Sequence, residues 1–180
     1  PQAAKTGALG NAEVAEALGW QIPNFNFPLI VDPVIISKHG NLLLDIEGEH
    51  ILRTKIIPHA FLVTPNLTEA SRLAEIEVTD LKSMEQAAIR ISKLGAKNVL
   101  IKGGHLENQH CENQATDLLY SGKEFYRFPA TRIDTKHTHG TGCTYSAAIT
   151  AQIAHKKSLL EAVKLAKEFI TAAIKQTPGL

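Results

Sequence analysis

The sequence of 180 residues is 44% hydrophobic and 21% charged, which is typical of a globular domain with its own core. Its 19 Lys and Arg residues nearly balance its 18 Asp and Glu residues, so the net charge of +1 argues against nucleic acid or an anionic membrane as a partner. No apolar run is long enough to span a bilayer, and no signal peptide opens the sequence. We therefore expect a single domain over residues 1–180 in the cytoplasm, where its two cysteines stay reduced.

The first third of the chain predicts a helix, a strand, a second helix and a second strand. Asn11 is placed to cap a helix that Gly19 ends. The continuous apolar run at residues 29–31 is typical of a buried strand, and a proline follows it closely. A helix over residues 46–57, weakened by one internal glycine, precedes a second buried strand over residues 60–63.

The middle of the chain continues this alternation. Ser83 is followed three residues later by Gln86, the spacing of a capping box, which predicts a helix that starts at Ser83 and closes at Gly95. Residues 98–101 are apolar and short enough to form a third buried strand.

The last third predicts a hairpin and two helices. Residues 115–120 and 123–128 flank a Ser-Gly turn and predict two antiparallel strands. A helix over residues 144–154 and a last helix, capped by Ser158 and running toward Gln176, complete the chain. Strands separated by helices of this length predict an α/β fold, with a mostly parallel sheet covered on both faces.

Three predicted strands end in polar or glycine-rich groups: Asp32-Pro33, Thr64-Pro65-Asn66 and Lys102-Gly103-Gly104. In open α/β sheets, ligands bind beyond the carboxyl ends of the strands. Each group by itself is equally well explained as a turn or a helix cap. Together they predict a shared site at one edge of the sheet.

The segment Thr138–Thr144, with the letters Thr-His-Gly-Thr-Gly-Cys-Thr, is the strongest candidate for the chemistry. Its glycines let successive backbone N–H groups point at one spot, and the following helix adds unpaired N–H groups with a partial positive charge. Such a nest suits a phosphoryl group in transfer. The segment is not a Walker loop, because no Gly-Lys-Ser or Gly-Lys-Thr follows the glycines, and it lies too late in the chain for a dinucleotide fingerprint.

Cys143 lies where that helix is predicted to begin. A helix N-terminus stabilises a thiolate, which can take a proton from an attacking alcohol. The alternative is a small buried cysteine that packs the helix against the sheet. Lys102, at a strand end, is a candidate contact for a nucleotide phosphate, although most lysines are simply solvated.

Two carboxylates are candidate ligands of Mg²⁺, which prefers carboxylate oxygens and water. They are Asp32, which otherwise closes a turn before a proline, and Glu69, which otherwise complements a helix dipole. A zinc site at His105, His110 and Cys111 is disfavoured, because no second pair of ligands accompanies them.

Four motifs make the sequence resemble the bacterial hydroxymethylpyrimidine/phosphomethylpyrimidine kinases, in the order and spacing of that family. They are Val31-Asp32-Pro33-Val34, Thr64-Pro65-Asn66-Leu67-Thr68-Glu69-Ala70, Ile101-Lys102-Gly103-Gly104-His105 and His139-Gly140-Thr141-Gly142-Cys143-Thr144. Lys5-Thr6-Gly7-Ala8-Leu9 is similar to a segment near the middle of those enzymes. The resemblance runs from Pro1 to Leu180, and any one motif without the others is weak.

The resemblance implies a ribokinase-like αβα sandwich that phosphorylates 4-amino-5-hydroxymethyl-2-methylpyrimidine and its monophosphate for thiamine, with ATP and Mg²⁺. It also implies a homodimer. Carried over by position, the site has an anion hole, a base at Cys143, metal ligands and nucleotide contacts. The anion hole is Gly140, Thr141, Gly142 and Cys143, the metal ligands are Asp32 and Glu69, and the nucleotide contacts are Asn66 and Lys102.

The sequence departs from this family where substrate choice lies. The glycine-rich start of family members, and a lid that carries a pyrimidine-contacting Gln, are not found before Pro1. We therefore expect residues 1–180 to be the larger, C-terminal part of the kinase domain and to be poorly active alone. A cysteine-bearing pyridoxine/pyridoxal kinase and a non-catalytic kinase-like binding module remain the alternatives.

Overall fold

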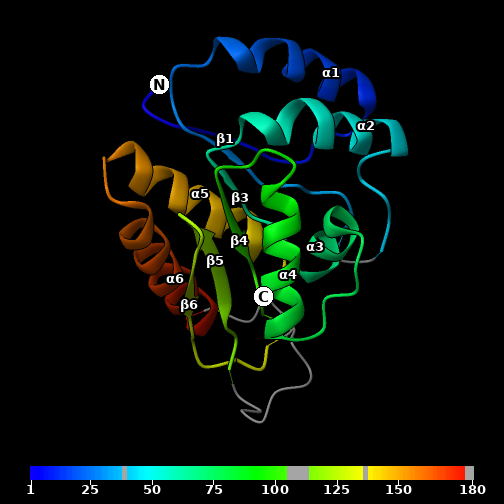
Figure 1. Ribbon diagram of the computed structural model, residues 1–180. Helices are drawn as coiled ribbons and strands as arrows, with labels where there is room; N and C mark the ends of the chain where they lie inside the picture. Colours follow the sequence, from blue (N-terminus) through cyan, green and yellow to red (C-terminus); the bar gives the residue numbers. More distant parts are fainter. Residues whose placement is uncertain (38–39, 105–113, 136–137, 177–180) are drawn as a thin grey trace.

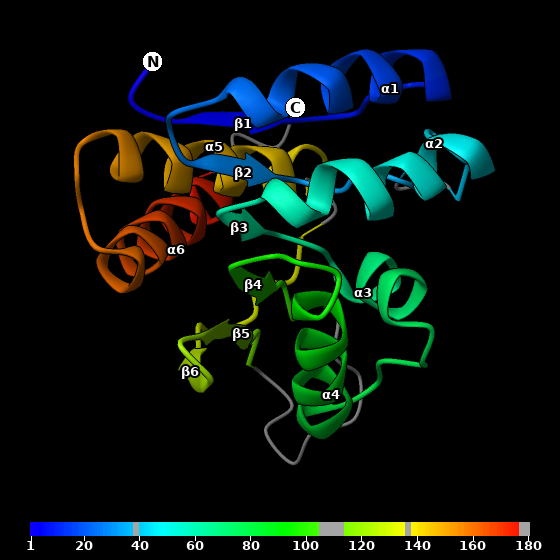
Figure 2. The same ribbon diagram turned by 45° about the horizontal axis from the view of Figure 1, so that its top comes forward.

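One six-stranded sheet, with the strands in sequence order, organises the computed structural model, which describes residues 1–37, 40–104, 114–135 and 138–176. The strands are β1 (Ala4–Thr6), β2 (Leu29–Val31), β3 (Leu62–Val63), β4 (Asn98–Ile101), β5 (Asp117–Ser121) and β6 (Glu124–Phe128). The first four strands are parallel, and β5 and β6 add an antiparallel hairpin beside β4. Figure 2 shows the six strands following one another between two layers of helices.

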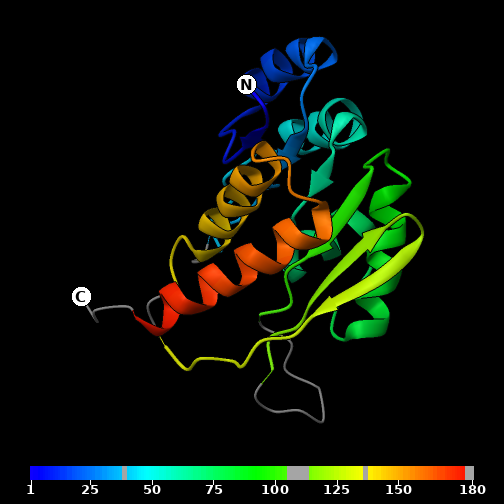
Figure 3. The ribbon, with the colours of Figure 1, turned by 90° about the vertical axis from the view of Figure 1, so that its left-hand side faces the viewer.

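Helices cover both faces of the sheet, as expected for an αβα sandwich (Figures 1 and 3). The helices on one face are α1 (Ala12–Gln21), α2 (Ile46–Ile51), α3 (Leu67–Ala74) and α4 (Leu81–Ser92). The helices on the other face are α5 (Thr141–Ala154) and α6 (Leu159–Lys175). A short 3₁₀ turn, Ile22–Asn24, follows α1. Helix α2 continues as a π-helix over Leu52–Ile56, and a second 3₁₀ turn, Ile57–His59, ends it. Among the described residues, no helix is long and apolar enough to cross a membrane.

Alternation along the strands divides the core into two parts. Val31, Val63 and Val99 point toward the layer of α1 to α4. Their neighbours Ile30, Leu62 and Leu100 point toward α5 and α6. Both sets are buried, because side chains alternate across a strand and helices cover both faces. The side chain of the residue that directly follows β2, β3 or β4 therefore points toward α5 and α6.

Several predicted boundaries were wrong, for local reasons. Helix α1 continues past Gly19, which packs so closely that an added Cβ would lie 3.2 Å from Lys55 Cβ. Asp80, not Ser83, caps α4: Ser83 is the third helical residue and closes a reciprocal capping box with Asp80. The hairpin turns at Gly122-Lys123, both with positive φ, rather than at Ser121-Gly122.

Two further corrections bear on the site. Strand β1 was not predicted, because its sequence Ala-Lys-Thr lacks the apolar run that marks the other parallel strands. Helix α5 begins at Thr141, three residues earlier than predicted, so Gly142 and Cys143 lie in its first turn. The glycines had suggested a longer loop.

A candidate phosphate-binding site

The first turn of α5 differs from the other helix starts. Its N-cap is Gly140, with φ +76°, and no side chain caps it. The other five α-helices of the described residues are capped by an Asn, Asp or Ser side chain. Thr144 is the first α5 amide with an intrahelical partner, 2.9 Å from Gly140 O. The amides of Gly142 and Cys143 precede that bond, so they can donate hydrogen bonds to an anion at the helix start.

Lys102 lies directly beside this turn. A Cβ added to Gly142 would be 3.2 Å from Lys102 Nζ, so the glycine leaves room for the ammonium group at the start of the helix. The Lys102 amide donates to Pro65 O at 2.9 Å, which ties the end of β4 to the loop after β3. The helix start and the lysine thus present positive charge to the same region.

Asp32 lies at the centre of the strand ends. The side chains of Ile30, Leu62 and Leu100 face α5 and α6. Because side chains alternate along a strand, the residues two positions later, which are Asp32, Thr64 and Lys102, also project under α5. Asp32 Oδ1 accepts from Thr64 Oγ1 at 3.0 Å and from Lys102 Nζ at 2.9 Å. Asp32 Oδ2 accepts from Ser146 Oγ at 2.9 Å. The carboxylate is 2% exposed and is held on both of its oxygens.

Glu69 and Asn66 form the capping box of α3. Asn66 Oδ1 accepts from the Glu69 amide, and Glu69 Oε2 accepts from the Asn66 amide, both at 2.8 Å. Burial raises the pKa of Glu69 to about 7; Lys102 and the Asn66 amide oppose that shift, and the charge of Asp32 adds to it. Asp32 and Glu69 are therefore two buried carboxyl groups that both interact with the charge of Lys102, and burial favours the protonated form of Glu69.

These carboxylates fit a hard divalent cation, because a cation near them would offset the burial cost that raises the pKa of Glu69. The described residues hold no group of three or more His, Cys, Asp or Glu side chains that could bind a metal. A Mg²⁺ ion keeps several waters and needs only one or two carboxylates, so two are sufficient. The disfavoured zinc residues, His105, His110 and Cys111, lie outside the described residues.

Cys143 is exposed and free, at the open end of α5, which disagrees with a cysteine that packs the helix against the sheet. Its side chain is therefore accessible to a substrate, as a proton acceptor must be. The predicted residues Asp32, Asn66 and Lys102 follow the carboxyl ends of the adjacent strands β2, β3 and β4, and Glu69 lies in the first turn of α3, three residues after Asn66.

Four polar residues at or behind the site had no role assigned from sequence. Thr64 and Ser146 hold Asp32, while Asp117 accepts from the Gly103 amide at 2.9 Å and from Lys167 Nζ at 2.7 Å. This Asp117–Lys167 pair is largely buried, and it ties α6 to the turn that follows Lys102. Ser146 had a usable signal: it is a hydroxyl on the apolar face of an alanine-rich helix.

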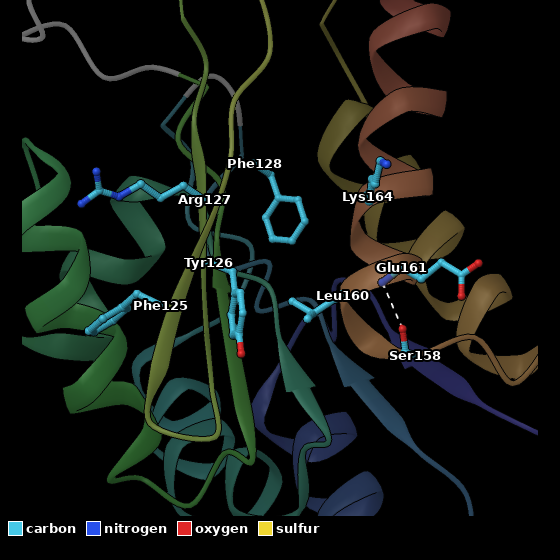
Figure 4. A pocket seen from close by; sticks show the side chains of 8 residues that line it. All are labelled: Phe125, Tyr126, Arg127, Phe128, Ser158, Leu160, Glu161 and Lys164. Carbon is cyan, nitrogen blue, oxygen red and sulfur yellow. Dashed lines mark hydrogen bonds between the residues drawn. The ribbon is translucent and has the colours of Figure 1, made fainter.

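A groove between β6 and α6 lies apart from these residues (Figure 4). Tyr126 and Phe128 of β6 point across it toward α6, while Phe125 and Arg127 point to the opposite face of the sheet. Its lining residues are Phe125, Tyr126, Arg127, Phe128, Ser158, Leu160, Glu161 and Lys164. None of the predicted site residues lines it, so the groove plays no part in the phosphate chemistry described above.

The whole chain matches one protein family. The family model described as phosphomethylpyrimidine kinase matches residues 1–180. The chain belongs to this family. A hydroxymethylpyrimidine/phosphomethylpyrimidine kinase of Bacillus subtilis is 41% identical over 181 residues, which cover 100% of this chain and 66% of the relative. One of Aquifex aeolicus is 44% identical over 178 residues, which cover 98% and 68%. The chain thus spans about two thirds of the length of these curated relatives.

Solved structures confirm the expected ribokinase-like α/β fold. The ADP complex of Bacillus subtilis pyridoxal kinase superposes with a TM-score of 0.88 at 40% identity, over 97% of this chain and 65% of that one. The pyridoxal kinase of Staphylococcus aureus with AMP-PCP and pyridoxal gives 0.86 at 35%, over 98% and 62%. The phosphomethylpyrimidine kinase of Clostridium difficile gives 0.82 at 35%, over 97% and 69%.

Proposed function

We propose that this protein transfers the γ-phosphoryl group of ATP to 4-amino-5-hydroxymethyl-2-methylpyrimidine and to its monophosphate, as part of thiamine biosynthesis. One observation carries the proposal: the uncapped first turn of α5 lies beside Lys102, above a buried pair of carboxylates. Membership of the phosphomethylpyrimidine kinase family supports the acceptor. Residues 1–180 would belong to one kinase domain.

The start of α5, Gly140 to Cys143, would hold the phosphoryl group during transfer, mainly through the backbone amides of Gly142 and Cys143, since the Thr141 amide already donates to Thr138 O at 3.3 Å. Their N–H groups are already oriented, so little reorganisation is needed as negative charge shifts between oxygens. Lys102 would bind a nucleotide phosphate through its ammonium group, and Asn66 would lie beside it, at the start of α3. Structures of relatives with ADP and AMP-PCP support the use of ATP.

Asp32 and Glu69 would hold Mg²⁺, directly or through its waters, because both are hard oxygen donors in a site with unbalanced negative charge. When bound, the ion would supply charge neutralisation for the phosphates. Both Asp32 oxygens already accept hydrogen bonds, and direct coordination of the ion would displace some of these donors. Asp32 is therefore better suited to orient a water molecule of the ion.

Cys143 would act as the base. With the hydroxymethyl pyrimidine, the substrate hydroxyl oxygen bonds to the γ-phosphorus, the bond from that phosphorus to the β,γ-bridging oxygen breaks, and the hydroxyl proton passes to the Cys143 thiolate as ADP leaves. With the monophosphate, an ionised phosphate oxygen attacks the γ-phosphorus in the same way, and no proton has to be removed. The thiol is exposed at the helix start, and a substrate bound at the anion site would lie next to it. Because a working thiol must stay reduced, we place the protein in the cytoplasm.

ADP release by the full protein tests the proposal. We expect turnover with the hydroxymethyl and phosphomethyl pyrimidines, and a loss of about 10²- to 10⁴-fold in kcat in Cys143→Ala with ADP affinity unchanged. Absence of turnover with both pyrimidines would contradict the proposed acceptor. A wild-type rate in Cys143→Ala would contradict the base but leave the anion site standing.

A pyridoxal kinase is the second candidate, because two of the similar solved structures are described as pyridoxal kinases. The same anion site and base would serve it, since only the acceptor alcohol differs. Competition between pyridoxal and the hydroxymethyl pyrimidine in one assay distinguishes the two. A non-catalytic module is disfavoured because Asp32, Lys102 and Cys143 are all present, with Lys102 paired to Asp32 and the Cys143 thiol exposed.

We also propose a homodimer, following the family resemblance. Trp20 and Ile46 are 70% and 80% exposed, and such apolar side chains favour association when a partner covers them. Trp20 is the single tryptophan, so its fluorescence reports any change in its surroundings. Sedimentation of a monomer at the concentrations used in the assay would contradict the dimer.

A further inference from the structure

Ser146 connects two parts of the site that lie 114 positions apart in the chain. Its hydroxyl lies 2.9 Å from Asp32 Oδ2 and 3.0 Å from the carbonyl oxygen of Cys143. The residue is completely buried, on the second turn of α5. It therefore bridges the central carboxylate of the sheet edge and the backbone of the candidate base.

The chemistry of the hydroxyl gives this bridge a direction. A serine hydroxyl has one proton, and both of its neighbours are acceptors. The Asp32 carboxylate is the stronger acceptor when ionised, because hydrogen bonds to a charged group are shorter and stronger. The proton is thus directed mainly at Asp32, across the gap between helix and sheet.

Apolar packing alone would not set this register. Tyr145, Ile149 and Ile153 hold α5 on the sheet, but hydrophobic contacts are non-directional and tolerate small sliding movements. A buried hydrogen bond between charged and polar groups fixes a distance and an angle. Ser146 lies only three residues after Cys143, so whatever fixes Ser146 also fixes the first turn of α5.

We propose that Ser146 is a positioning residue, which sets the first turn of α5, and with it the amides of the anion site and Cys143, relative to Asp32. This inference rests on the proposed function. Thr64 provides a matched comparison: its buried hydroxyl also donates to Asp32, but Thr64 directly follows β3, and within the described part of the chain its hydroxyl has no hydrogen bond to α5.

The test compares Ser146→Ala with Thr64→Val in the full protein, with Thr150→Val as a control. Each of the first two variants removes one buried donor from Asp32. The Thr150 hydroxyl donates to the Ser146 carbonyl, within α5, and among the described residues it has no hydrogen bond to Asp32. We expect Ser146→Ala to lower kcat by about 10- to 100-fold relative to Thr64→Val, because misplacement of a catalytic group by about 1 Å has an effect of that size. The KM for ATP should change by less than about threefold, and Thr150→Val should match the wild type.

Alkylation of Cys143 by iodoacetamide, followed by mass spectrometry of its peptide, gives a readout that needs no substrate. We expect Ser146→Ala to change its rate by more than about threefold and Thr64→Val by less, because thiolate reactivity depends on the local field at the helix start. If neither pyrimidine is phosphorylated, the proposed function fails and this alkylation comparison still tests the positioning role.

Equal kcat values and equal alkylation rates in Ser146→Ala and Thr64→Val would overturn the inference, since Ser146 would then be only one more donor to Asp32. Urea unfolding confirms that each variant is folded. If Ser146→Ala does not fold, Ser146→Cys takes its place, because it keeps nearly the same volume but donates only weakly, and it is judged by the same two comparisons.

Discussion

Lys102 Nζ lies 2.9 Å from Asp32 Oδ1, and this ion pair joins residues 70 positions apart at the edge where the phosphate chemistry is proposed. The side chains are 15% and 1% exposed, so the pair is largely shielded from solvent. The same ammonium group lies beside Gly142. Asp32 thus holds Lys102 in the place where a nucleotide phosphate would meet it.

Replacement of Lys102 by Met should weaken both nucleotide binding and the fold. Without the ammonium group, Asp32 becomes a buried charge with only neutral donors, and we expect a loss of about 3–5 kcal/mol in the free energy of unfolding. Affinity for ADP should fall by at least about tenfold, the equivalent of one charge-assisted contact. Urea denaturation and calorimetric titration with ADP measure the two effects.

The double variant Asp32→Asn with Lys102→Met separates these contributions. It removes both charges, so much of the lost stability should return while ADP affinity stays low. A double variant as unstable as Lys102→Met would show that the ion pair is not the source of the loss.

Gly142→Ala should separate stability from binding. Alanine is favoured over glycine in a helix by about 1 kcal/mol, so the melting temperature should stay the same or rise. The new Cβ would lie 3.2 Å from Lys102 Nζ and push the ammonium group away from the helix start by a few tenths of an ångström, so ADP affinity should fall while the ion pair with Asp32 is kept. Gly19→Ala is the matched control, because Gly19 lies in α1, away from the site, and its new Cβ would also lie 3.2 Å from a lysine side-chain atom, Lys55 Cβ. Equal ADP affinities in the two variants would contradict the placement of Lys102.

The pKa of Glu69, raised to about 7, makes stability depend on pH in an unusual direction for a carboxylate. Between the ordinary glutamate pKa of 4.5 and about 7, the folded protein keeps a proton that the unfolded chain releases. The stability from this proton is full below pH 4.5 and is lost as the pH rises through about 7. The total change is about 3 kcal/mol, since one pKa unit corresponds to about 1.4 kcal/mol.

Glu69→Gln should remove this pH dependence. We expect the variant to be more stable than the wild type at pH 8 and nearly equal to it at pH 4.5, in urea denaturation with EDTA present. Glu47→Gln, at an exposed position of α2, is the control for a change in surface charge. A wild-type pH profile in Glu69→Gln would show that another group carries the effect.

Bound nucleotide should protect Cys143 from alkylation. The thiol is exposed at the start of α5, and a phosphate held by the neighbouring amides would cover it. We expect saturating ADP to slow modification of the Cys143 peptide by more than about fivefold, in proportion to site occupancy. At an ADP concentration equal to the wild-type Kd, Lys102→Met should lose most of the protection that the wild type still shows, because its site is then largely empty. Unchanged alkylation with ADP bound would place the nucleotide elsewhere.

The sequence by itself determined the alternation of helices and strands, and the three polar strand ends, because both follow from local patterns. Residues 29–31 and 98–101 have the bounds predicted for β2 and β4. Asn11 and Ser158 cap the helices that they were expected to cap. Where two cap signals lay close together, at Asp80 and Ser83, local reasoning chose the wrong residue.

Tertiary structure decided which side chains meet. Parallel pairing places Asp32, Thr64 and Lys102 in one row under α5, and only this packing makes Ser146 their partner. Burial, which depends on all the surrounding elements, raises the pKa of Glu69. No local pattern contains these effects, because hydrogen bonds and desolvation depend on distances between residues that are far apart in the chain.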